Sequence, residues 1–412
     1  MGDQSTAEDL GLGCEATLPN DQRVTAENWR TPPFNRYALQ RIQQFTRTAR
    51  VPRPEHTYDL PDAHQDITGV TYQAPDGVQR TFDDMVNRTW TDGVLVLHKG
   101  KVIHEQYLNG MRSDTVHLMF SCSKSMTSTL AGVLGHRGEL DVEQSIESLL
   151  PEFAETALAG ARVQDLLDMR VSVNITDQYT DLDDQAIRAA VAGGWRMPHL
   201  GYDGPEDIVA FIRTLTEPDG DHADVFHYRS ILTATLGLCI ERATGEPLFE
   251  TFGRLIWQPM GAEHDFVTIV DTSGHAAAGG GFNCCLRDFG RFAWMIASGG
   301  NDIVPKGWIE ACASPSQELY AAFEKSEYAE VFPGFAYFNK WWVRPGGRVF
   351  MALGIHGQTM YIDPDNEFVA AKFSSQPEPV NEEAFWEQIL AFEAVAAKLG
   401  GKQKSAAPIC KK

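Results

Sequence analysis

Strand-forming segments lie on either side of a long central stretch of helical pattern, and this arrangement constrains the fold of the 412-residue chain more than any other feature. Residues 93–110 (GVLVLHKGKVIHEQYLNG) hold two β-rich runs around a Lys-Gly-Lys turn, which predicts a hairpin. Further strands are predicted near the C-terminus, at 335–343, 348–354, 358–364 and 367–374. Helices are predicted between these two regions and after the last strand, at 122–137, 163–169, 206–215, 231–243 and 381–399.

We therefore expect an α+β fold of two lobes. The N-terminal hairpin and the C-terminal strands would join in one antiparallel sheet flanked by helices, and the central helices would form a mainly helical lobe. A catalytic cleft is expected between the two lobes. An N-terminal extension that wraps the core is predicted at residues 1–85, and a disordered tail at 401–412. The catalytic domain is predicted at 86–400, with an α/β lobe from 86–120 and 270–400 and a helical lobe at about 121–269.

The tetrad Ser121-Cys122-Ser123-Lys124 stands at the start of the predicted helix 122–137. Residues three apart share one face of a helix, so Ser121 and Lys124 are expected to point the same way. The helix N-terminus favours an oxyanion beside Ser121, and a buried Lys124 loses its proton more easily and can accept that of the serine. The same four residues also fit an N-capping serine followed by an exposed lysine, so the pattern needs support from elsewhere.

Two further segments supply candidate partners. Tyr228 precedes the predicted helix 231–243, where its phenol, with a pKa lowered by a lysine ammonium, would serve as base or proton shuttle. The alternative is an aromatic side chain that only packs. Residues 352–358 (ALGIHGQ) lie at the edge of a predicted strand, and their glycines allow a ligand to approach the backbone closely. The alternative there is an ordinary β-turn.

The order and setting of these three motifs resemble the penicillin-recognising serine hydrolases, which include class C β-lactamases, DD-peptidases and family VIII esterases. Within that superfamily the chain is most similar to the 6-aminohexanoate-dimer hydrolases, the nylon-oligomer amidases. The resemblance covers roughly residues 85–395. The phrases that carry it are FSCSKSMTSTLAGVL, VQDLLDM, FHYRSILTATLGLCIERATGEPL, IWQPMGAEHD and ALGIHGQ.

The resemblance implies a role for each matching residue. Ser121 is the expected nucleophile, Lys124 helps to deprotonate it, and Tyr228 completes the proton network and protonates the leaving amine. The family's K-T-G strand falls on residues 352–354, so the backbone N–H of Ile355 is expected to form the oxyanion hole with that of Ser121. The expected substrate-binding residues are Tyr179, which would close over the amide, Trp341, which would pack on the substrate, Gly354, and His356, for which capping a turn is an equal alternative.

The chain departs from the family pattern at two places. The Lys and Thr of K-T-G, which grip the carboxylate of β-lactams and peptides in the relatives, are replaced by Ala352 and Leu353. We therefore expect weak β-lactamase and DD-peptidase activity, and a neutral amide or ester, or one with a remote amine, as substrate. Ser230 stands where Asn is commoner, so one amide donor is missing.

The expected function is hydrolysis of a linear amide through an acyl-enzyme on Ser121. A carboxylesterase or transacylase with the same residues is the first alternative, and a non-catalytic binding protein on this scaffold is the second. The expected partner is a small amide or ester, no cofactor is expected, and a homodimer is left open.

Charge and composition exclude several other classes. A formal net charge of −21 argues against nucleic acid and against anionic membranes as partners. The sequence has no export signal and no long apolar run, which gives a cytoplasmic location as the expectation. No metal site is expected, since the group Asp221, His222, Asp224 and His227 lacks a clean ligand spacing. Finally, an acidic group in a predicted loop is expected to be solvated, with a substrate amine as the alternative ligand: Asp181, Asp183 and Asp184.

Overall fold

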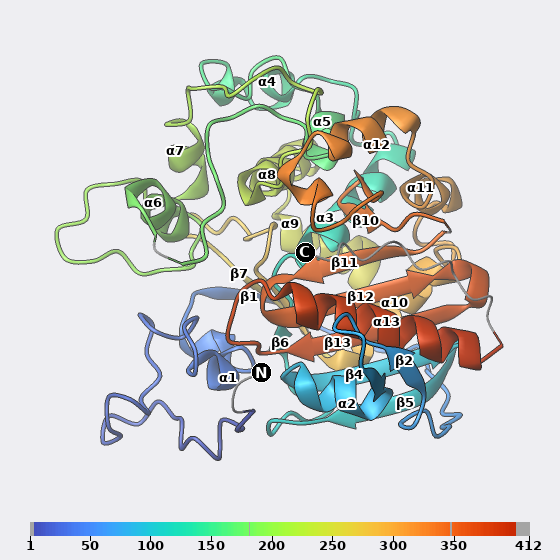
Figure 1. Cartoon of the computed structure of the whole chain (residues 1–412). Helices are drawn as coiled ribbons and strands as arrows, with labels where there is room; N and C mark the ends of the chain where they lie inside the picture. The colour runs from blue at the N-terminus through green and yellow to red at the C-terminus, as the bar shows by residue number, and fades with distance from the viewer. Residues whose placement is uncertain (1–3, 181, 347, 401–412) are drawn as a thin grey trace.

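The computed structural model describes residues 4–180, 182–346 and 348–400, so the predicted tail 401–412 lies outside it. Among the described residues the largest sheet has seven antiparallel strands in the order β5-β4-β13-β12-β11-β10-β9 (Figure 1). The bounds of these strands are β4 (Thr91–His98), β5 (Lys101–Tyr107), β9 (Ala336–Phe338), β10 (Trp341–Val343), β11 (Phe350–Gly354), β12 (Gln358–Asp363) and β13 (Phe368–Ser374). Strand β13 pairs with β4, which confirms that the N-terminal hairpin and the C-terminal strands form one sheet.

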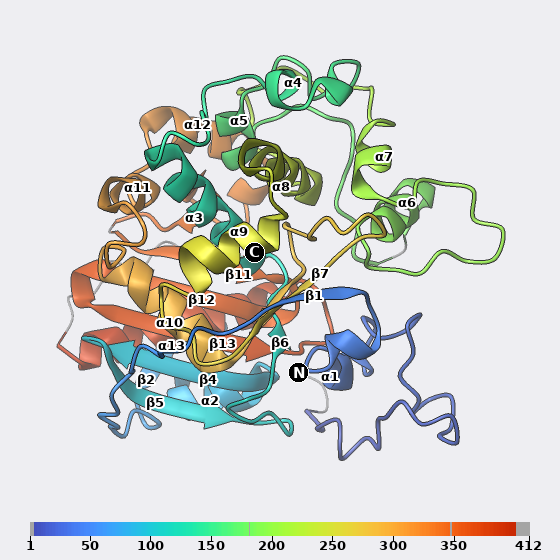
Figure 2. The same ribbon diagram turned by 180° about the vertical axis from the view of Figure 1, so that it is seen from behind.

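Helices cover both faces of this sheet. The last helix, α13 (Glu382–Lys398), lies on one face together with α2 (Phe82–Arg88), and the ring of Phe392 in α13 meets that of Tyr361 in β12 (Figure 1). Helix α10 (Leu286–Ala297) lies on the opposite face against β4, β12 and β13 (Figure 2). The sequence analysis predicted α13 and missed α10.

The helical lobe stands beside one end of the sheet and is built around α3 (Cys122–His136) and α8 (Ser230–Thr244), which contact each other (Figure 1). Both helices lie close to their predicted bounds. The other helices of this part of the chain are α4 (Ile146–Leu149), η2 (Pro151–Phe153), α5 (Val163–Leu167), α6 (Asp184–Ala192), α7 (Ile208–Ile212), α9 (Leu248–Phe252) and η3 (Gly253–Trp257). Later segments add α11 (Lys306–Cys312), α12 (Gln317–Glu324), η4 (Glu327–Ala329), η5 (Ile355–Gly357) and η6 (Pro364–Asn366).

A second sheet, which the sequence analysis did not predict, has the strand order β1-β7-β8-β6. It joins the N-terminal extension to the segment that leads into α3. Its strands have two to four residues each, too few to show the alternation that marks a strand in a sequence. They are β1 (Thr48–Val51), β6 (His117–Leu118), β7 (Phe266–Ile269) and β8 (Phe282–Cys284).

The strand predicted over 335–343 is two strands, β9 and β10, joined by a two-residue turn. Asn339 and Lys340 form this turn with φ angles of 48° and 65°. Left-handed conformations at both central positions are what a type I′ hairpin requires. Because Lys rarely adopts this conformation, a turn at these two residues is not indicated by residue type.

The N-terminal extension, called the arm below (residues 4–77), follows the surface of both lobes (Figures 1 and 2). It contains α1 (Asn35–Ala38), η1 (Ile42–Gln44), β1 and β2 (Thr71–Gln73), which pairs with β3 (Gln79–Thr81). The Arg36 guanidinium in the arm lies 3.2 Å from the fully buried Asp92 carboxylate of β4. The predicted boundary at residue 85 falls inside α2, so the arm and the catalytic domain are continuous at that point.

No helix among the described residues is long and apolar enough to cross a membrane.

Candidate active site

The first two candidate residues meet at the N-terminus of α3. Ser121 is the N-cap residue of this helix, yet its side chain makes no capping hydrogen bond. The Nζ atom of Lys124, one turn later, lies 2.8 Å from the Ser121 hydroxyl oxygen, and Lys124 is only 1% exposed. Both observations exclude the alternative of a capping serine with an exposed lysine.

The ammonium group of Lys124 has three oxygen partners. Besides Ser121, it donates to the Ser230 hydroxyl at 2.9 Å and to the Gly279 carbonyl at 2.6 Å. Burial lowers the pKa of Lys124 to about 8, against an opposing effect of the Asp177 carboxylate. At pH 7 about a tenth of Lys124 is therefore neutral and able to accept a proton, and this fraction rises as the pH approaches 8.

Asp177 fixes the direction of the bonds around Lys124. The Ser230 hydroxyl donates to Asp177 Oδ2 at 2.6 Å, and the Ser230 backbone N–H donates to the same carboxylate at 3.0 Å. Since the proton of Ser230 is engaged by Asp177, its oxygen faces Lys124 as an acceptor. The Gly279 carbonyl can only accept. A neutral Lys124 therefore gives its two protons to these oxygens and keeps its lone pair for the Ser121 hydroxyl.

The Tyr228 hydroxyl lies close enough to the Ser121 side chain for Ser121 to lower its pKa. Its ring lies 4.9 Å from the Lys124 ammonium and contacts the rings of Tyr328, Tyr337 and Trp342. The predicted fall of the Tyr228 pKa is wrong: burial raises the pKa well above its ordinary value, and Ser121 offsets only part of this rise. Tyr228 is thus a neutral phenol that holds a proton, which suits an acid or a relay rather than a base.

The predicted oxyanion hole depends on a close approach of two backbone segments. Ser121 and Ile355 each stand at the beginning of a helical turn, where N–H groups lack partners within the helix. A Cβ atom on Gly354 would lie 2.6 Å from the Met119 carbonyl oxygen. Only glycine allows β11 to lie this close to the segment that leads into Ser121.

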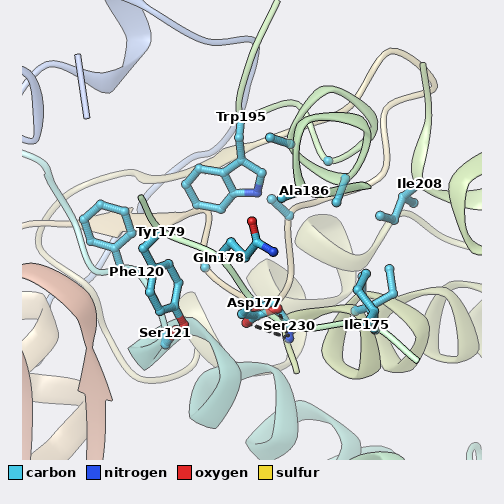
Figure 3. A pocket seen from close by; sticks show the side chains of 18 of the residues that line it. Phe120, Ser121, Ile175, Asp177, Gln178, Tyr179, Ala186, Trp195, Ile208 and Ser230 are labelled. Atoms are coloured by element: carbon cyan, nitrogen blue, oxygen red, sulfur yellow. Dashed lines mark hydrogen bonds between the residues drawn. The ribbon is translucent and has the colours of Figure 1, made fainter. Parts of the chain in front are cut away.

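Two cavities meet at Ser121, and Ile355 and Tyr179 also line both of them. One, called the arm cavity, lies between the arm, the Asp177 loop and α6, and Figure 3 shows Trp195 and Phe120 on one side of it. The other, called the aromatic cavity, lies against β11 and is lined by Tyr228, Tyr328, Phe332, Trp342, Leu353 and Gly354 among others. A substrate can therefore extend from Ser121 in two directions.

The structure separates the predicted substrate-binding residues into two groups. Tyr179 lies beside Ser121 in Figure 3 and lines both cavities, and Gly354 lines the aromatic cavity. Trp341 lines neither of them, because its indole is buried against Phe350 on the other face of the sheet, and its neighbour Trp342 takes the place at the cavity.

His356 is buried behind the site instead of facing either cavity. It is 3% exposed, and its Nδ1 atom lies 2.7 Å from the Gln376 carbonyl, to which it donates. Burial lowers the pKa of His356 to about 4, so the ring is neutral near neutral pH. Of the two predicted roles, the structure favours the support of a turn, that of η5.

The competing clusters are occupied by internal bonds. Both ring nitrogens of His222 bond to backbone groups, at Ser172 and Ala159, and the described residues contain no group of three potential metal ligands. Asp183 accepts from the N–H of Ala186 as the N-cap of α6, and Asp184 pairs with Arg188. Asp181 lies outside the described residues.

Sequence reasoning missed two contributors to this site, Asp177 and Gly279, and of the adjacent pair Trp341 and Trp342 it chose the one that does not line a cavity. Asp177 follows Thr176 in a segment without helix or strand pattern, so nothing in the sequence connects it with Ser230. Gly279 contributes only a carbonyl oxygen, which any residue type carries. Trp342 was a foreseeable candidate, since adjacent residues of a strand face opposite ways.

Comparison with known proteins connects this geometry to a family. The Beta-lactamase family profile matches residues 78–393. The 6-aminohexanoate-dimer hydrolase of Paenarthrobacter ureafaciens is 31% identical over 361 residues, which cover 86% of this chain and 89% of the relative. A Bacillus anthracis structure described as a presumed 6-aminohexanoate-dimer hydrolase matches with a TM-score of 0.84 and 26% identity, over 93% of this chain and 99% of the other.

A family VIII carboxylesterase structure shares the fold, with a TM-score of 0.57 and 15% identity over 77% of this chain and 95% of the other. The family profile spans more than half of the chain, and the curated relative is similar over most of both lengths. These matches confirm the resemblance deduced from the three motifs. The chain belongs to the beta-lactamase family and is a hydrolase of that superfamily, related to the 6-aminohexanoate-dimer hydrolases.

Proposed function

We propose that the protein hydrolyses linear amides through an acyl-enzyme on Ser121. The observation that carries the proposal is the position of Ser121 between two cavities, with Ile355 and Tyr179 lining both. A linear amide would place its carbonyl at that junction and one end of its chain in each cavity. The relationship to 6-aminohexanoate-dimer hydrolase, whose name denotes a dimer of an amino acid as substrate, supports an amide as the substrate.

The first half-reaction begins with a neutral Lys124. Its lone pair accepts the Ser121 proton while the serine oxygen attacks the carbonyl carbon. The backbone N–H groups of Ser121 and Ile355 stabilise the negative charge that develops on the carbonyl oxygen. The C–N bond then breaks, and the amine leaves with the proton that Lys124 holds, relayed through the Tyr228 phenol.

The second half-reaction repeats these steps with water. Lys124 accepts a proton from the water molecule, which attacks the acyl carbon, and Ser121 recovers its proton as the acid leaves. At the end of the cycle Ser121, Lys124 and Tyr228 have returned to their starting protonation states, and one water molecule has been consumed. An ester enters the same cycle, with an alcohol as the leaving group, and an amine in place of water gives transacylation.

The aromatic cavity argues against β-lactams as the main substrate. Leu353, at the position of the Thr in the K-T-G strand of the relatives, lines this cavity with an apolar side chain. Ala352, at the position of the Lys, is 1% exposed and presents no charge. The carboxylate of a β-lactam therefore lacks the two groups that bind it in those relatives.

A substrate panel tests the proposal. Linear amides, p-nitrophenyl esters and a chromogenic β-lactam are compared on the wild type and on Ser121→Ala, with added amines as competing acceptors. We expect burst kinetics with activated esters, acylation of Ser121 detected by mass spectrometry, and turnover of linear amides above that of the β-lactam.

A fully active Ser121→Ala variant would contradict the acyl-enzyme. Failure of activated esters and of a fluorophosphonate to label Ser121 would support the non-catalytic alternative instead.

A further inference from the structure

Arg30, in the arm, lines the arm cavity, and its side chain has no hydrogen-bond or ion-pair partner among the described residues. It is partly buried and lines that cavity together with Ser121. Its guanidinium lies 5.7 Å from the centroid of the Trp29 ring and makes no hydrogen bond or ion pair with any of the described residues. A guanidinium group carries five N–H donors and stays charged in proteins, so the described residues leave the donors of Arg30 without an acceptor.

This situation is unusual among the described arginines. Four of them lack a side-chain hydrogen bond or ion pair to described residues: Arg30, Arg47, Arg196 and Arg213. Arg47 and Arg213 are exposed, where water satisfies their donors. Arg30 and Arg196 are partly buried. Burial lowers the pKa of Arg30 to about 10, and the nearby positive charge of Arg196 contributes to this fall.

The two described acidic residues that line the arm cavity, Asp177 and Asp271, have other partners. Asp177 is held by Ser230, as described above. Asp271 accepts from three backbone N–H groups, those of Ile208, Ser273 and His275, at 2.9–3.0 Å. In a chain of net charge −21, a guanidinium group that lines a cavity without a hydrogen-bond or ion-pair partner among the described residues forms a local site for an anion, and the nearby charge of Arg196 adds to the positive potential there.

Aromatic stacking holds Arg30 in place relative to the nucleophile. Trp29 stacks on Trp195 with ring centroids 6.5 Å apart, and Trp195 stacks on Phe120, the residue before Ser121, at 6.2 Å. The buried pair of Arg36 and Asp92 fastens the following part of the arm to the main sheet. The arm is therefore a fixed wall of the cavity, and a ligand anion meets a guanidinium whose position is set.

We propose that Arg30 binds a carboxylate carried by one end of the linear substrate. This inference rests on the proposed function and narrows its substrate class to amides and esters with an anionic end. It also revises the expectation of a neutral substrate or one with a remote amine: the carboxylate contact of the K-T-G strand is lost from the aromatic cavity, and Arg30 supplies one of different origin in the arm cavity.

Matched substrate pairs test the proposal. For the acyl end, p-nitrophenyl monoesters of dicarboxylic acids are compared with p-nitrophenyl esters of fatty acids of equal chain length. For the amine end, N-acyl ω-amino acids are compared with N-acyl alkylamines of equal length. The quantity measured is the ratio of kcat/KM for the anionic substrate to that for its neutral match, in the wild type and in Arg30→Gln, Arg30→Lys and Arg47→Gln.

We expect the ratio to fall about tenfold in Arg30→Gln for one of the two ends, mainly through KM, because a charge-assisted hydrogen bond is lost. Arg30→Lys keeps part of the ratio, and the control Arg47→Gln, which removes the same charge from an exposed site, keeps all of it. The end of the substrate for which the ratio falls is the end that lies in the arm cavity.

Two outcomes overturn the proposal, and they differ. If wild-type enzyme turns over the neutral esters but Arg30→Gln leaves both ratios unchanged, Arg30 does not bind the substrate and the proposed function stands. If the wild type turns over none of the four substrate types and Ser121 is not acylated, the proposed function fails and this inference fails with it.

Discussion

Two lysines lie side by side in the core, and only one of them is equipped for chemistry. Lys124 and Lys340 are each 1% exposed, and burial lowers the pKa of both. The Nζ atom of Lys124 has three oxygen partners, whereas that of Lys340 finds no hydrogen-bond partner among the described residues. Burial thus favours the neutral form of both lysines, and the surrounding acceptors determine where the lone pair of a neutral Lys124 points.

The backbone of Lys340 explains why a lysine without a side-chain partner is tolerated there. Its carbonyl accepts from the Ser125 hydroxyl of α3 at 2.7 Å, and its N–H donates to the Leu167 carbonyl at 3.0 Å. The turn between β9 and β10 thus supports the helix that carries the nucleophile. The contribution of Lys340 lies in its main chain, while that of Lys124 lies in its side chain.

Replacing each lysine with methionine gives the largest contrast. Lys124→Met removes the base and should lower kcat/KM on a neutral ester by about 10³-fold, since general-base catalysis is worth roughly 10²–10⁴-fold. Lys340→Met should stay within about threefold of the wild type, because its Nζ bonds to none of the catalytic groups. Initial rates on one activated ester measure both. Equal losses in the two variants would contradict the distinction.

Asp177→Asn tests what aims the lone pair of Lys124. An amide can donate to Ser230 and reverse its hydroxyl, so kcat should fall by about 10–100-fold while KM changes little. The Asp177 charge raises the pKa of Lys124, so its removal should also move the pH dependence to lower pH. A purely structural role would lower the activity without moving the pH dependence.

The pH dependence of the wild type follows from Lys124. The base acts when neutral, so kcat/KM on an uncharged ester should rise with pH and level off above about 8, where burial places the pKa of Lys124. Well below this value the rate should fall about tenfold per pH unit. Lys340→Met should keep the same midpoint. A profile that is flat between pH 5 and 8 would show that another group is the base.

The smallest expected effect concerns stability. The unfolded chain keeps Lys340 protonated up to about its ordinary pKa of 10.5, whereas the folded protein releases that proton at a much lower pH. Between these two pH values the unfolded state binds more protons, so wild-type stability rises with pH. Lys340→Met removes this dependence and an unsatisfied buried amine, and should raise the free energy of unfolding at pH 7 by about 1–3 kcal/mol.

Urea unfolding at pH 7 and pH 10 measures this effect. The advantage of Lys340→Met over the wild type should shrink at the higher pH. A variant that is less stable than the wild type at both pH values would mean that the Lys340 amine has a favourable interaction, and the contrast with Lys124 would be lost.

The contacts that the sequence could predict are those between residues close in the chain, and the contacts that it could not predict depend on tertiary packing. Ser121 and Lys124 are one helical turn apart, so their contact follows from local geometry, and the long strands β4 and β11–β13 show clear patterns. Asp177 and Ser230 meet only through tertiary packing, 53 residues apart in the chain, and no local pattern links them. Trp341 was preferred to Trp342 because of the resemblance to the nylon-oligomer amidases, and the alternation of a strand alone does not tell which of two adjacent indoles faces the cleft.

The arm has a consequence for the way this protein divides its tasks. The family profile begins at residue 78, so Ser121, Lys124 and Ile355 lie within the region that it matches, while Trp29 and Arg30 lie before it. The residues proposed for the reaction and the residue proposed to select the substrate therefore lie on opposite sides of that boundary. A change at Arg30 would then alter which molecules are accepted without touching the groups proposed to react with them.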